Sequence, residues 1–61
     1  MTKGDRVTVY EDPITQCKTE GVAKLIDFMG DSWWDGKRVE LWSVKFTDDP
    51  KRVVYRKILT D

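Results

Sequence analysis

Hydrophobic and polar residues alternate with a period of two along most of this chain. In residues 6–10, Val7 and Val9 share one face, and the intervening positions take the other. Alternation that is rich in β-branched residues is typical of a half-buried β-strand. Pro13 ends this strand shortly afterwards, because proline has no N–H to donate to a sheet. Residues 14–20 then form a polar connection.

A second apolar run, residues 22–29, lies between Gly21 and Gly30. Both of its faces carry apolar side chains, which indicates a central strand or one that curls between two layers. Eight residues between glycines are short for a helix, and no helix-capping residue precedes them. We therefore expect a strand that Gly30 closes.

The remaining chain predicts two more strands separated by turns. Asp35-Gly36 is a strong turn signal, because glycine supplies the positive φ that tight turns need. In the third strand, Trp42, Val44 and Phe46 share one face. In chain order, we expect a polar loop at 31–37, a strand at 38–47, a turn at 48–51, a strand at 52–56 and a short 3₁₀ turn at 57–59.

Short strands with turn chemistry between them predict one all-β domain covering residues 1–61. So small a chain protects its strand edges most simply by closing its sheet. The smallest common closed solution is an SH3-like barrel of about five antiparallel strands, and this is the fold we expect.

The opening Lys3-Gly4-Asp5-Arg6-Val7-Thr8-Val9-Tyr10 resembles the first strand of SH3-like barrels of the Tudor, chromo-barrel and KOW kind. The chain is also similar to short uncharacterised proteins encoded by bacteria and their phages. Both resemblances rest on an alternating pattern over most of the chain, and what they imply is an SH3-like barrel. The later segments that carry them are Glu20-Gly21-Val22-Ala23, Trp42-Ser43-Val44-Lys45-Phe46 and Val53-Val54-Tyr55-Arg56-Lys57-Ile58.

Composition removes several classes of chemistry. The chain has no histidine and one cysteine, Cys17, so histidine-based catalysis, ordinary zinc ligation and an intrachain disulfide are excluded. We expect no enzyme, no metal and no cofactor. A lone cysteine favours the reducing cytoplasm, and Cys17 reads as an unremarkable loop thiol. The start of the chain has no apolar segment of the kind found in secretory signal peptides. The chain contains no run of about 18 apolar residues, so we expect no membrane-spanning helix.

The pattern of acidic residues favours turns over metal-binding sites. A calcium loop starting at Asp31 would need ligands at its third and twelfth positions, which are Trp33 and Trp42. The calcium pattern therefore fails. Asp12 is placed to accept hydrogen bonds from the backbone N–H of Ile14 or Thr15 in an Asx turn.

Trp33-Trp34 is the most informative local feature. Adjacent residues of an extended segment point to opposite sides, so the core takes at most one of them easily. The other would be an exposed anchor for a protein partner, a peptide or a stacked base, and Tyr10 is a further candidate contact for a protein partner. The alternative interpretation is that both tryptophans cover an open end of the barrel. The sequence leaves open which of the two is exposed.

The densest positive segment lies near the C-terminus and suggests nucleic-acid binding. Basic side chains could contact phosphates, and Tyr55 could stack on a base. Eleven basic and eleven acidic residues nevertheless give no net charge, and a solvated face paired with nearby acids is the alternative. The candidate residues are Arg38, Lys51, Arg52, Tyr55, Arg56 and Lys57, and Lys37 and Lys45 could join them if the third and fourth strands pair.

Taken together, these patterns predict a non-catalytic interaction module. We expect it to recognise a protein partner through the Trp33/Trp34 loop and the neighbouring strand edges. A homodimer formed through such an edge is a further arrangement the sequence allows. The alternative function is that of a KOW-like or Tudor-like nucleic-acid-binding barrel that uses the basic C-terminal strand.

Overall fold

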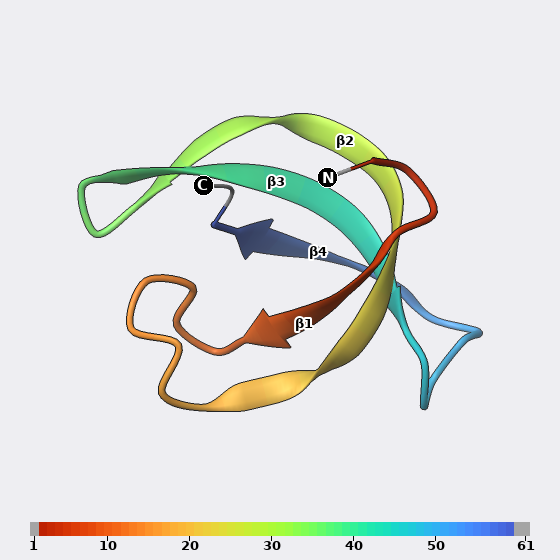
Figure 1. The fold of residues 1–61 in the computed structure, drawn as a ribbon. Coiled ribbons are helices and arrows are strands. Elements are labelled where there is room, and N and C mark those ends of the chain that lie inside the picture. The colour runs from red at the N-terminus through yellow and green to blue at the C-terminus, as the bar shows by residue number, and fades with distance from the viewer. Residues whose placement is uncertain (1, 60–61) are drawn as a thin grey trace.

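The computed structural model describes residues 2–59, which form one antiparallel sheet of four strands (Figure 1). The all-β prediction is confirmed. The order of the strands in the sheet is their order in the chain, and β1 and β4 are its two edges. The sheet is therefore open, and it has four strands instead of about five. The strands are β1 (Arg6–Tyr10), β2 (Thr19–Trp34), β3 (Lys37–Phe46) and β4 (Val53–Ile58).

The four strands match the four segments predicted from the pattern, and the fifth strand expected of a barrel is absent from residues 2–59. β2 is longer than expected, a single strand of 16 residues. The prediction that Gly30 closes this strand is wrong. Its pairing with β3 shifts register between Leu25 and Asp27 and again between Phe28 and Gly30. Bulges of this kind bend a strand and increase its twist. Gly30, at a φ of 130°, provides a backbone conformation that other residues rarely adopt. In Figure 1, β2 accordingly arcs around the sheet from bottom to top.

The hairpin between β2 and β3 confirms the predicted turn and corrects the predicted loop. Trp34 pairs with Lys37 across the two residues Asp35 and Gly36, whose φ angles are 51° and 76°. Two positive φ angles are the mark of a type I′ turn, which matches the twist of the flanking strands. The tryptophans therefore lie in a strand and not in a loop.

The end of the chain also differs from expectation. β4 extends to Ile58, so the predicted 3₁₀ turn at residues 57–59 is wrong. Ile58 is a buried member of the core. A backbone paired with β3 as far as Ile58 holds this side chain in place, which an isolated 3₁₀ turn would do less firmly.

The core is one cluster built from all four strands. The predicted inner face of β3 is confirmed, since Trp42 and Val44 are buried and Phe46 packs against the cluster. Leu25 pairs with Val44 and Ala23 pairs with Phe46, so neighbouring strands meet side chain to side chain. The buried residues of the cluster are Val9, Ala23, Leu25, Trp42, Val44 and Ile58, and the partly buried Val7, Phe46 and Val54 pack against them.

The connection from β1 to β2 is held by the predicted Asx turn. The Asp12 carboxylate accepts hydrogen bonds from the backbone N–H of Ile14 at 2.9 Å and of Thr15 at 3.2 Å. Pro13 is buried, and Cys17 is exposed farther along the same connection. The Asx turn and the buried proline give this segment a defined course beside the open edge of the sheet.

Replacing Leu25 by alanine tests the core. Leu25 is fully buried, so we expect Leu25→Ala to lower the free energy of unfolding by about 2–5 kcal/mol. Val22→Ala, in the same strand but half-exposed, should cost less than about 1 kcal/mol. Urea unfolding followed by circular dichroism measures both. Equal losses for the two variants would contradict the placement of the core.

Candidate functional site

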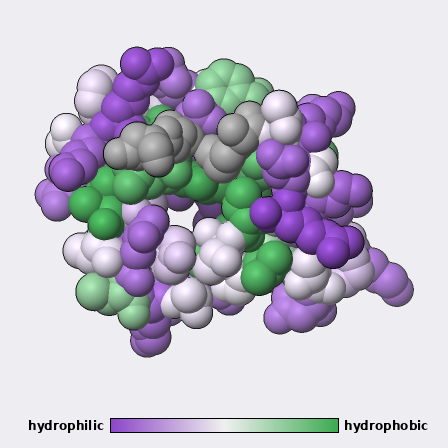
Figure 2. All heavy atoms as spheres, viewed as in Figure 1, coloured by the Kyte–Doolittle hydropathy of each residue, from purple (hydrophilic) through white to green (hydrophobic). Residues whose placement is uncertain are grey.

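The gap between the two edge strands is the first concave feature of the molecule. Val9 of β1 and Ile58 of β4 belong to the same core cluster, although their strands are not paired. A cleft of about 130 Å³ lies between these strands, and Tyr10 is among the residues that line it. Figure 2 shows a hollow near the centre of this view, with hydrophobic residues along its upper side. The edges approach each other without closing the sheet.

A larger cleft, of about 590 Å³, lies beside β4. Trp34 and Tyr55 contribute aromatic surface, and Pro13 and Leu41 contribute apolar surface. Lys57 lines this cleft as well as the smaller one, as does Pro13. The two clefts are therefore neighbours that share a wall. A third concavity, of about 400 Å³, lies on the other side of Arg56, toward the turn between β3 and β4.

An ion pair between Glu20 and Arg56 divides the larger cleft from this third concavity, since both residues line both spaces. The guanidinium donates two hydrogen bonds to the carboxylate, at 2.8 and 2.7 Å, and lies 5.6 Å from the ring centre of Phe46. Such two-pronged pairs have a fixed geometry. The hydrogen bonds lower the pKa of Glu20 and raise that of Arg56. The pair joins β2 to β4 across the open side of the sheet.

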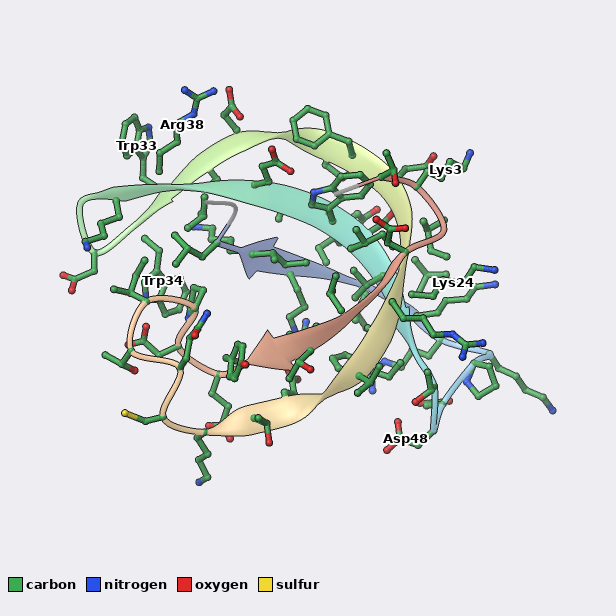
Figure 3. All side chains as sticks on the ribbon, viewed as in Figure 1. Lys3, Lys24, Trp33, Trp34, Arg38 and Asp48 are labelled. Atoms are coloured by element: carbon green, nitrogen blue, oxygen red, sulfur yellow. The ribbon has the colours of Figure 1, made fainter. Side chains whose placement is uncertain are left out.

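The two tryptophans lie on opposite sides of the hairpin, as strand alternation requires. Trp33 is 65% exposed, and in Figure 3 it stands beside Arg38, while Trp34 points toward the connection between β1 and β2. Lys57 lies 5.8 Å from the ring centre of Trp34. The backbone N–H groups of Ile14 and Thr15 lower the pKa of Asp12, and a hydrogen bond with the Trp34 side chain lowers it further. Of the two tryptophans, Trp33 is thus the exposed one, whereas Trp34 is half-buried near Lys57 and Asp12.

The basic residues proposed for nucleic-acid binding do not gather on one face. Arg38 forms an ion pair with Asp31 at 2.9 Å at the far end of the hairpin, and Arg56 is paired with Glu20. Lys57 donates a hydrogen bond to the Trp33 carbonyl at 3.2 Å. Alternation along β4 also separates Arg56 from Tyr55 and Lys57. Lys51 and Arg52 lie outside the strand, before β4 begins.

Sequence reasoning missed Glu20 and Pro13 as parts of this region. Glu20 is 36 residues from Arg56 along the chain, so no local pattern links them. A carboxylate beside Gly21, at the start of a strand, gave no distinctive signal. From the sequence, Pro13 indicated only the end of a strand. Its burial against the cleft depends on the course of the connection that follows it.

Within residues 2–59, no three histidine, cysteine, aspartate or glutamate side chains gather in a way that could hold a metal ion. The same residues include no helix with the length and apolar character needed to cross a membrane. No protein-family model, curated protein or solved structure matches the chain.

The Glu20–Arg56 pair predicts a pH dependence of stability. Because folding lowers the pKa of Glu20, the contribution is present above the unfolded pKa, about 4.3, and is lost as pH falls through the folded value. We expect Glu20→Gln to reduce stability at pH 7 by about 1 kcal/mol or less, since both side chains are about one-third exposed. Urea unfolding between pH 2 and 7 should show the difference from the wild type shrinking in acid. A difference that is the same at every pH would contradict this role.

Proposed function

We propose that this chain is a non-catalytic binding module that recognises an extended segment of a protein partner in the cleft beside Trp34. The observation that carries the proposal is the makeup of that cleft. Two aromatic side chains, Trp34 and Tyr55, lie with Pro13 and Leu41 in a space of about 590 Å³. Aromatic side chains in such concavities are frequent energetic anchors of interfaces.

Charge at the border of the cleft supports a polar peptide ligand over a purely apolar one. Glu11 and Glu20 contribute carboxylates, while Arg56 and Lys57 contribute cations. Because Glu20 and Arg56 are paired with each other, Glu11 and Lys57 are the two opposite charges that would fix the direction of a bound segment. Hydrogen-bonding groups of an extended peptide backbone could also be satisfied at an unpaired strand edge, as in other cases of strand addition.

Trp33 and Tyr10 extend the proposed contact surface in two directions. Trp33 faces away from the cleft, so a partner that closes around the end of the hairpin would contact both tryptophans. Tyr10 lines the smaller cleft, which shares Pro13 and Lys57 with the larger one. The proposed surface thus runs from the hairpin end, past the buried proline, to the edge of β1.

We further propose that the fold is a variant of the SH3-like barrel. Support comes from the length of β2, whose two bulges divide it into segments that could serve as two barrel strands. The shared core of β1 and β4 also supports it, because these are the edges that a closed barrel would join.

Selection of peptide ligands tests the proposed function. Random 12-residue peptides selected against the wild type should bind Trp34→Ala at least about 30-fold more weakly, because an interface anchor is worth about 2 kcal/mol or more. Met29→Ala removes another exposed apolar side chain and should leave binding unchanged. Amide chemical shifts of the wild type should change around Pro13, Trp34 and Tyr55. Selected peptides that bind both variants as tightly as the wild type, or that move amides elsewhere, would refute the assignment of this cleft.

A further inference from the structure

The register of the sheet places three cations in one row across three neighbouring strands. Arg6 of β1 pairs directly with Lys24 of β2, and Lys24 pairs directly with Lys45 of β3. The row ends at Val53 of β4, which pairs with Lys45. No sequence pattern predicts this row, because neighbouring members are 18 and 21 residues apart in the chain. Only strand pairing aligns them.

This row lies on the face of the sheet that is turned away from the core. The flanking residues in the strands, Ala23, Leu25 and Val44, are fully buried, whereas Arg6 and Lys24 are exposed and Lys45 is half-buried. Side chains alternate along a strand, so the cations and the core occupy opposite faces. Figure 3 shows Lys24 extending outward at the bend of the sheet, far from Trp33 and Trp34.

Like charges directly opposite each other destabilise a sheet, and no ion pair within residues 2–59 includes these three side chains. The four ion pairs found among those residues involve Lys3, Lys18, Arg38 and Arg56 instead. Their partners account for four carboxylates. Others are engaged locally, as Asp5 is with Thr2 and Glu40 is with the Trp42 indole. A chain with no net charge thus carries a row of three cations that take no part in these ion pairs.

We propose that this row binds the phosphate backbone of a single-stranded nucleic acid. Neighbouring strands are about 4.8 Å apart, so the three cations span about 10 Å in a line, which suits successive charges of a polyanion. Tyr55 is 60% exposed and lies on the same face, two residues beyond Val53, where its ring can stack on a base. A narrow row on a neutral domain fits one strand better than a duplex, whose binding engages many phosphates.

This surface shares Tyr55 with the cleft assigned to a peptide, and its other residues lie outside that cleft. Of the residues that the sequence suggested for nucleic-acid binding, it includes Tyr55 and Lys45. Two half-exposed valines, Val22 and Val53, lie next to the cations. They are too short to enter a bilayer deeply, so the proposal is for a nucleic acid and not for an anionic membrane.

Fluorescence anisotropy with a labelled 12-nucleotide oligouridine tests the proposal. Wild-type protein should bind at 50 mM NaCl and weaken as salt rises. Lys24→Gln/Lys45→Gln should lower the affinity by about 10-fold or more and reduce the magnitude of the logarithmic salt slope by about 1.4, or about 0.7 for each lost contact. Tyr55→Leu should weaken binding by roughly 5-fold or more. Thermal unfolding should show that the lysine variant is at least as stable as the wild type, since it removes a repulsion.

Lys51→Gln/Arg52→Gln is the matched control, because it removes the same charge from the turn before β4. Its affinity and salt slope should stay close to those of the wild type. Equal losses for the two double variants would overturn the row as the site, as would an absence of binding at 50 mM NaCl. Binding to vesicles with 30% phosphatidylserine, without binding to the oligonucleotide, would assign the face to a membrane and refute the proposal.

Discussion

The bending of β2 is the constraint on which the rest of the structure depends. This strand pairs with β1 through its first part and with β3 from Ala23 to Trp34. A straight strand would hold β1 and β4 far apart in a flat sheet, with one apolar face open to water. The register shifts after Leu25 and after Phe28 turn the sheet back on itself instead. Residues of both edge strands then share one core.

The bend also creates the concave surfaces. Because the curled sheet does not close, its open side is occupied by side chains and not by backbone hydrogen bonds. Glu20 and Arg56 meet there, and the clefts lie to either side of them. On the opposite face, strand pairing alone places Arg6, Lys24 and Lys45 side by side. One sheet thus offers two chemically different surfaces.

Structural features that depend on neighbouring residues could be predicted from the sequence, whereas the pairing between strands could not. The alternation in residues 6–10, the Asp35-Gly36 turn and the Asx turn of Asp12 all depend on neighbouring residues, and each is as expected. The continuation of β2 through Gly30 depends on a bulge opposite Leu41, which only the partner strand makes visible. The exposure of Trp33 follows from that continuation. The ion pair and the row of cations join residues that are distant in the chain, so their charges could be counted but not placed.

The order of the strands has a consequence for how the chain reaches this structure. Every paired strand is joined to its neighbour by one direct connection, so each hairpin can close with only a short loop to constrain. The tight two-residue turn makes the β2–β3 hairpin the natural nucleus. A contact between the start of β2 and β4, such as Glu20 with Arg56, needs both the β2–β3 and the β3–β4 hairpins in place first. We therefore expect the Glu20–Arg56 pair to form late, after the rate-limiting barrier, so that it slows unfolding without speeding folding.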